Sequence, residues 1–303
     1  MATRKTAASS KKTAATRKKA APVAKKASTR VTTVAASASS NRSRASRGAL
    51  PTNLVNILLA ELVGTFVLTS VAIMTSSDVV PLYIGLTFAV IVLAVGGVSG
   101  AHVNPAVTFG LWASRRLKSA LVPFYWVAQL IGAMAAVLVG SAVSGTKIAL
   151  DFGHFGTFTW PIFFAELIGT AIFIFGLVSV LNRAELSSNG KALGIGLALF
   201  VGLVVGGTFY TEARTGAISK YQTAAQKDSN AEISHEIYVK GVTLNPAIAL
   251  ASTESTKDEL TSGSAGDSEK HYSRLGWEVI LSTLIGAALG GNLALLVAYR
   301  FRS

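Results

Sequence analysis

Residues 98–112 read VSGAHVNPAVTFGLW and residues 242–252 read VTLNPAIALAS, so the tripeptide NPA occurs twice in the chain. The hexapeptide AELVGT at 60–65 likewise returns as AELIGT at 165–170. Two markers repeated in the same order indicate that the halves of the chain are related copies.

Six long apolar stretches surround these motifs. The chain is 50% hydrophobic and only 14% charged, whereas about a quarter of the residues of a soluble domain are charged. A hydrocarbon core about 30 Å thick needs about 20 helical residues. Stretches close to this length lie at 54–74, 82–98, 120–143, 160–181, 192–210 and 275–299. We therefore predict an all-α membrane protein with six transmembrane helices.

The two NPA segments are too short to cross. NPAVTFGLW (104–112) and NPAIALAS (245–252) reach about half the length of a span, so we predict re-entrant half-helices. Three spans per copy is an odd number, which inserts the second copy upside down as an inverted repeat. The expected channel domain is 54–303, with repeat one at 54–143 and repeat two at 160–303.

The basic charge is concentrated in an N-terminal tail. Residues 1–53 hold thirteen of the 28 Lys and Arg, and no acidic residue precedes Glu61. The tail has too few large apolar side chains to fold, so we expect it to be disordered. It is expected to contact anionic lipid, with nucleic acid and an organelle transit peptide as alternatives.

Positive charge also predicts the orientation. Six spans place both termini on one side, and the basic tail and seven further basic residues fall on that same side, which predicts cytoplasmic termini and a cell-membrane location. These residues are Arg115, Arg116, Lys118, Arg183, Lys191, Arg300 and Arg302. The polar stretches 208–240 and 254–274 are expected to be exposed outer loops, the first of them long.

Each NPA motif has the chemistry of a helix start that faces a cavity. Proline suits the first helical position, and an asparagine before it caps the helix while its NH2 group stays free to donate. Two half-helices that meet end to end place two positive helix ends at the midplane, which favours a neutral oxygen and opposes cations. The motif residues are Asn104, Pro105, Ala106, Asn245, Pro246 and Ala247.

The segments before the motifs are expected to line a pore with backbone carbonyls. The residues concerned are Gly100, Ala101, His102, Gly241 and Thr243. The His102 ring has two interpretations, pore lining or fixing of the loop. Glu61 and Glu166 lie inside spans at equivalent places of the repeat, which favours a role in bracing the neighbouring loops.

These motifs resemble those of a known family. VSGAHVNPAVTFGLW is similar to the first signature of the major intrinsic proteins (aquaporins and aquaglyceroporins), and AELVGTF, YWVAQLIGA (125–133) and VTLNPA resemble its other marks. The resemblance covers about 54–302. It implies a homotetrameric channel that passes water or small uncharged, glycerol-like solutes and excludes ions and protons. It also implies that the protein is not an enzyme and needs no cofactor. The chain lacks cysteine, and no motif predicts a metal site.

The chain departs from the family at the constriction. The family's arginine after the second NPA is replaced by Ile248, and the aspartate of glycerol facilitators by Ala249. The resemblance places the other constriction positions at Ile84, Leu203 and Val242. Such an aliphatic selectivity filter is either wider or closes by dewetting. Two alternatives therefore remain, a closed or adhesion-type member and a secondary transporter.

Overall fold

The computed structural model describes residues 50–75, 79–145, 150–228, 230–262 and 271–300. Of the basic tail expected at 1–53, only residues 50–53 belong to this part of the chain, and Arg302 lies outside it.

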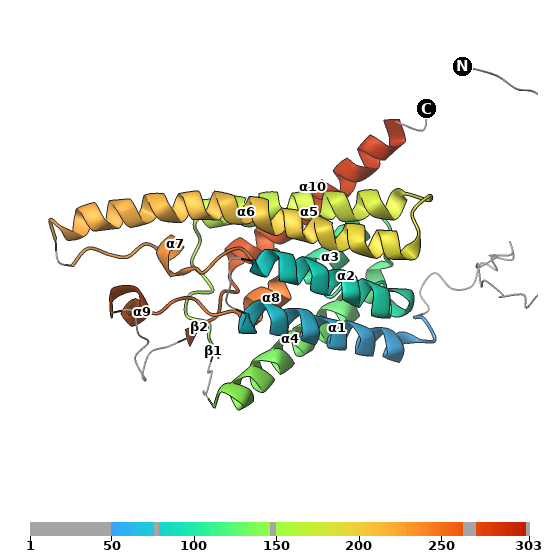
Figure 1. The fold of residues 1–303 in the computed structure, drawn as a ribbon, viewed down its shortest axis with the longest axis horizontal. Helices are drawn as coiled ribbons and strands as arrows, with labels where there is room; N and C mark the ends of the chain where they lie inside the picture. The colour runs from blue at the N-terminus through green and yellow to red at the C-terminus, as the bar shows by residue number, and fades with distance from the viewer. Residues whose placement is uncertain (1–49, 76–78, 146–149, 229, 263–270, 301–303) are drawn as a thin grey trace, which may run out of the picture. The chain divides into compact units, whose positions relative to one another are not determined.

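Six long helices form a bundle (Figure 1). They are α1 (Leu54–Met74), α2 (Val80–Ser99), α4 (Val122–Ser144), α5 (Trp160–Asn182), α6 (Ser188–Ala225) and α10 (Trp277–Arg300). Each contains a stretch long and apolar enough to cross a membrane. The prediction of an all-α membrane protein with six transmembrane helices is confirmed.

Two short helices contain the NPA motifs. These are α3 (Pro105–Ala113) and α8 (Pro246–Ala251), with nine and six residues. Both are too short to span a bilayer. In each half of the chain the short helix follows the second long helix and precedes the third, and α3 contacts α8. This is the arrangement expected of two re-entrant half-helices.

Glycines allow the long helices to approach closely. A Cβ atom added to Gly132 of α4 would overlap the Leu62 carbonyl oxygen of α1. One added to Gly290 of α10 would overlap the Ala171 carbonyl oxygen of α5. Helices in membranes associate through such small residues, so a side chain at either place would force the paired helices apart.

Helix α6 is longer than the sequence analysis predicts. A span was expected at 192–210 and an outer loop at 208–240, but α6 continues as one helix to Ala225. Its 38 residues extend roughly 57 Å at 1.5 Å per residue, well beyond the hydrocarbon thickness. The polar stretch is therefore helical in its first half, and Figure 1 shows the α6 ribbon projecting beyond its neighbours.

The end of the bundle at which α5 and α10 begin carries most of the non-helical chain (Figure 1, left). We call residues 150–159, 230–240, 252–262 and 271–276 the loop end. It contains the strands β1 (Leu150–Asp151) and β2 (His271–Tyr272), which pair in parallel, and the short helices α7 (His235–Tyr238) and α9 (Lys257–Ser262). The 3-10 helix η1 (Ser119–Leu121) precedes α4.

Candidate functional site

Asn104 and Asn245 cap the two short helices in the same way. Oδ1 of Asn104 accepts the N–H of Ala106 at 2.7 Å, and Oδ1 of Asn245 accepts the N–H of Ala247 at 2.9 Å. Each helix begins with the proline that follows the cap, where an N–H would have no partner within the helix. The cap fixes each amide, with its Nδ2 group directed away from its own helix.

The two asparagines reach across to the opposite motif. Nδ2 of Asn104 donates to the Leu244 carbonyl at 2.9 Å, and Nδ2 of Asn245 donates to the Val103 carbonyl at 3.2 Å. An amide NH2 has two hydrogens, and within the described residues neither Nδ2 has a second acceptor. One N–H of each asparagine therefore remains available where the half-helices meet.

Val103 and Leu244 make this crossed contact by adopting left-handed backbone. Their φ angles are 43° and 52°, a conformation that is rare for residues other than glycine and costs on the order of 1–3 kcal/mol. Gly64 and Gly169 make room for their side chains. A Cβ on Gly64 would lie 2.5 Å from Cγ1 of Val103, and one on Gly169 would lie 2.7 Å from Cδ2 of Leu244.

Glu61 holds the loop in front of the first motif. Oε1 accepts the His102 N–H at 2.9 Å and the Ser99 hydroxyl at 2.6 Å. Oε2 accepts the Val103 N–H at 2.7 Å and Nε2 of Gln129 at 2.8 Å. The side chain is completely buried, and its four hydrogen bonds offset the cost of placing a carboxyl group inside the bundle.

Glu166 holds the loop in front of the second motif with a different set of partners. Its oxygens accept the N–H groups of Thr243 at 2.9 Å and Leu244 at 2.8 Å. Nη2 of Arg274 lies 3.7 Å from Oε1 of Glu166. Nη1 of the same arginine donates to Glu278 at 2.8 Å. The second loop is thus braced by a carboxylate with a buried counter-charge.

Arg274 is a residue that the sequence analysis missed. It falls in the stretch 254–274, expected to be an exposed loop, yet only 3% of its surface is exposed. Of the Lys and Arg residues whose burial the structure describes, it alone is buried. Its Nε and Nη2 atoms have no hydrogen-bond partner there. A cation therefore lies beside the second loop, although Ile248 occupies the position after the motif.

The carbonyl groups expected to line a pore are free of protein donors. In the part of the chain that the structure describes, no hydrogen bond uses the carbonyl oxygens of Gly100, Ala101, His102, Gly241 or Thr243. The His102 ring is buried, with Nδ1 at 3.1 Å from the Thr108 hydroxyl and its centroid 4.5 Å from that of Tyr125. These contacts favour the loop-fixing interpretation of the ring.

The four expected filter residues come from separate elements and belong to, or pack against, one large apolar cluster. Ile84 of α2, Leu203 of α6 and Ile248 of α8 are buried in one apolar cluster, and half-buried Val242 packs against it. All four are aliphatic, so the cluster provides no side-chain donor or acceptor of its own. Polar contacts for a solute here would come from the backbone and from the asparagines.

Comparison with known proteins finds similarity to one protein family. A family model described as major intrinsic protein matches residues 58–217. Probable aquaporin NIP7-1 of Arabidopsis thaliana is 32% identical over 168 residues, covering 51% of this chain and 61% of that protein. Aquaporin Z of Photorhabdus laumondii is 31% identical over 194 residues, covering 54% and 84%.

Two further similarities were found. Glycerol uptake facilitator protein-like 6 of Lactiplantibacillus plantarum is 33% identical over 160 residues, covering 48% of this chain and 73% of that protein. The X-ray structure of the aquaglyceroporin from Plasmodium falciparum is 20% identical, with a TM-score of 0.49, covering 79% of this chain and 95% of that one. The family model matches more than half of the chain, and the chain therefore belongs to the major intrinsic protein family, whose aquaporins and aquaglyceroporins are membrane channels and not enzymes.

Proposed function

We propose that this integral, multi-pass membrane protein is a passive channel for water and small uncharged, glycerol-like solutes, which pass the contact between Asn104 and Asn245. The observation that carries the proposal is the crossed contact itself, which leaves one N–H on each asparagine. Carbonyl oxygens without protein donors precede both motifs. A molecule with a hydroxyl group can accept from the first and donate to the second, so its lost hydration is replaced.

Exclusion of ions and protons follows from the same geometry as part of this proposal. The N-termini of α3 and α8 each carry roughly half a positive charge, and both capping asparagines are 2% exposed. A cation between them would lose its hydration and meet two positive helix ends. A neutral solute avoids this penalty.

The aliphatic filter is proposed to set the range of solutes. The proposed filter consists of Ile84, Leu203, Val242 and Ile248. Without an arginine at position 248, it offers water no side-chain hydrogen-bond donor, and it admits solutes with a larger apolar surface. The same apolar lining is the feature that favours the second candidate, a pore closed by dewetting in a non-conducting, adhesion-type member.

A secondary transporter is less well supported by the contacts. Coupled transport needs intramembrane groups that exchange protons or ions. Glu61 is occupied by four hydrogen bonds, and Glu166 is held by two backbone N–H groups and faces Arg274. Both carboxyl groups therefore serve the loops, which we propose is their bracing function.

Flux in proteoliposomes tests the channel and the filter together. Light scattering after osmotic shock is compared for water, glycerol, urea and larger polyols in the wild type, in Ile248→Arg and in the conservative control Ile248→Val. We expect wild type and control to pass glycerol and larger polyols, and the arginine to slow the polyols about tenfold, a barrier about 1.4 kcal/mol higher. Zero flux of every solute in the wild type, with water flux in Ile248→Arg, would instead establish the closed member.

Location and assembly are part of the proposal. We place the protein in the cell membrane with both termini cytoplasmic, because Arg115, Arg116 and Arg183 all lie at the end of the bundle opposite the loop end. The tail 1–53 would then face anionic lipid. A homotetramer is proposed by resemblance to the family. Large exposed apolar side chains on the outer helix faces suit contact with lipid and with neighbouring copies.

A further inference from the structure

Three potential metal ligands converge at the loop end. His154 lies between β1 and α5, His235 begins α7, and Glu254 follows α8. Their ligand atoms all lie within 4.8 Å of one another. His154 and Glu254 are 100 residues apart in the chain, which is why no spacing motif revealed the group in the sequence.

The distances within this group approach those of a coordination sphere. Nδ1 of His154 lies 2.7 Å from Oε2 of Glu254, and Nε2 of His235 lies 3.6 Å from Oε1 of the same residue. Ligands about 2.0–2.1 Å from a tetrahedral metal are separated by about 3.3 Å. The His154 side chain is 31% exposed and Glu254 only 2%, so an ion can enter past His154.

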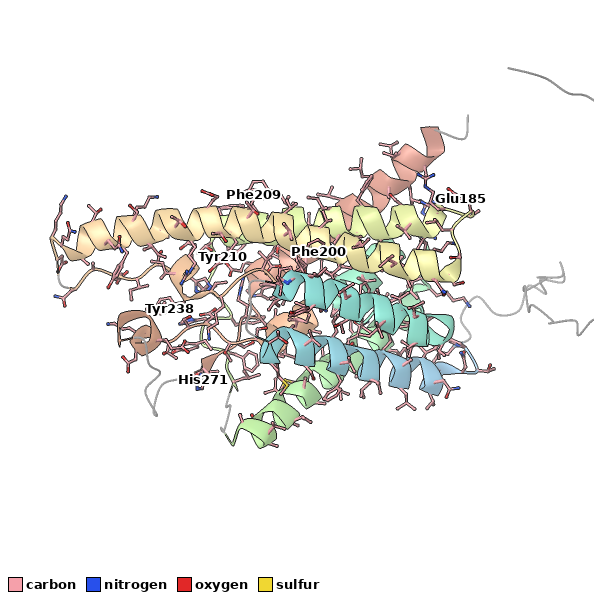
Figure 2. The ribbon with its side chains drawn as sticks, viewed as in Figure 1. Glu185, Phe200, Phe209, Tyr210, Tyr238 and His271 are labelled. Carbon is pink, nitrogen blue, oxygen red and sulfur yellow. The ribbon has the colours of Figure 1, made fainter. Side chains whose placement is uncertain are left out.

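Backbone contacts hold the three ligands in place. The Ser255 N–H donates to the Tyr238 carbonyl at 2.7 Å, which joins the end of α7 to the Glu254 segment. The Glu254 N–H donates to the Tyr272 carbonyl at 2.9 Å. The Tyr272 ring stacks on His154, with centroids 3.7 Å apart. Figure 2 shows Tyr238 at this end of the molecule. The group is thus supported by packed chain on several sides.

Buried carboxyl groups outnumber buried basic side chains around the group. Glu166, Glu254 and Glu278 are buried, whereas Arg274 is the one buried Lys or Arg within the described residues. Arg274 is shared by Glu166 and Glu278. His235 lies 3.3 Å from Glu278 and so links that carboxylate to the group. Buried carboxylates are stable only when paired, and a divalent cation beside Glu254 would supply the missing positive charge.

We propose that His154, His235 and Glu254 bind a divalent transition-metal ion of the Zn²⁺ class. Two imidazole nitrogens and one carboxylate form a ligand set that zinc accepts, with water in the fourth position. The ion ties the segment before α5, helix α7 and the segment after α8 to one another. It thereby fixes the chain that follows the second half-helix.

Zinc binding to the purified full-length protein, with any affinity tag removed, tests the proposal. Titration calorimetry with Zn²⁺ alone is expected to show one ion per chain. His154→Ala and His235→Ala should each weaken binding by at least about 100-fold, since loss of a ligand exceeds loss of an outer-shell partner. His271→Ala is the matched control, because His271 lies at the same end on β2 but outside the group (Figure 2). It should bind zinc as the wild type does.

A second variant keeps the test decisive if a histidine variant does not fold. Glu254→Gln preserves the shape of the side chain and removes the negative ligand, and size-exclusion chromatography checks that it is folded. It should lose zinc binding, and it should lose the rise in unfolding temperature that zinc causes in the wild type. Absence of a stoichiometric site in the wild type would overturn the proposal, as would equal weakening in His271→Ala. The group would then be a hydrogen-bonded cluster that needs no metal.

Discussion

Two membrane-buried glutamates, Glu61 and Glu166, hold the loops that carry the asparagines. Replacing Glu61 with Gln turns one oxygen into an NH2 group and leaves the N–H of His102 or Val103 without an acceptor. An unsatisfied buried donor costs about 1–3 kcal/mol, so the free energy of unfolding should fall by that amount in denaturant titrations in detergent. Glu185→Gln is the control, since Glu185 is exposed between α5 and α6. Equal stability of both variants would contradict the bracing role.

Arg274 permits a second test with a matched partner. Arg274→Met keeps much of the side-chain volume but leaves Glu166 and Glu278 without their shared cation. Breaking a buried ion pair from one side costs about 3–5 kcal/mol. Arg183→Met removes an exposed ion pair between Arg183 and Glu185, and the Arg183 side chain is 68% exposed. This variant should change the unfolding temperature little, because solvent screens exposed pairs. Similar losses of unfolding temperature in the two variants would show that Arg274 is not a structural counter-charge.

At the residue scale, the sequence was informative where chemistry is local. Asparagine before proline predicts a cap, and the structure places both caps as expected. The aliphatic residues proposed as the filter were predicted through the family pattern. Arg274 and the group around Glu254 had no local signal, because their partners come from distant segments and their stretch is polar enough to suggest solvent exposure.

At the element scale, α6 shows where hydropathy misleads. Residues 208–225 are polar, but they include four alanines and no proline, so they can continue the helix once α6 has begun. These residues also form hydrogen bonds with the segment around α7. The Tyr210 hydroxyl donates to the carbonyls of Glu236 and Val239, and Arg214 donates to Ile237. The extension therefore supports α7.

Gly216 tests this support. Gly216→Pro should break the extension, since proline costs about 3 kcal/mol in a helix interior, and should expose residues 226–240 to limited proteolysis. Gly216→Ala is the control. A Cβ there meets no atom within 4 Å, so alanine should stabilise the helix by about 1 kcal/mol. If both variants resist protease as the wild type does, α7 does not depend on the extension.

At the scale of the whole molecule, the inverted repeat could be predicted and the loop end could not. Glu61 and Glu166 occupy equivalent places, as do Val103 and Leu244, and they make equivalent contacts. In each copy of the repeat, a buried backbone N–H in front of the half-helix needs an acceptor. Among the residues that the structure describes, the loop end has no counterpart in the first half. Its strands have two residues each, too few for a periodicity, and they form only through contacts between distant segments.

The proposed assembly into a homotetramer can also be tested on the whole molecule. A homotetramer predicts a mass of four chains, after correction for detergent, in light scattering coupled to size-exclusion chromatography. Chemical cross-linking in liposomes should stop at four copies. A monodisperse monomer in both detergent and lipid would contradict the proposed assembly.

The central claim is that solutes pass between Asn104 and Asn245. Asn104→Asp and Asn245→Asp retain an oxygen that caps the helix, but they remove the donor N–H and add negative charge. Asn189→Asp in the exposed first turn of α6 is the control. Solute and proton flux should be measured on the same proteoliposomes by light scattering and a trapped pH dye. We predict that either motif variant slows water and glycerol and admits protons, while the control behaves as the wild type does. Unchanged solute flux and proton exclusion in both motif variants would show that the pathway does not run between the two asparagines.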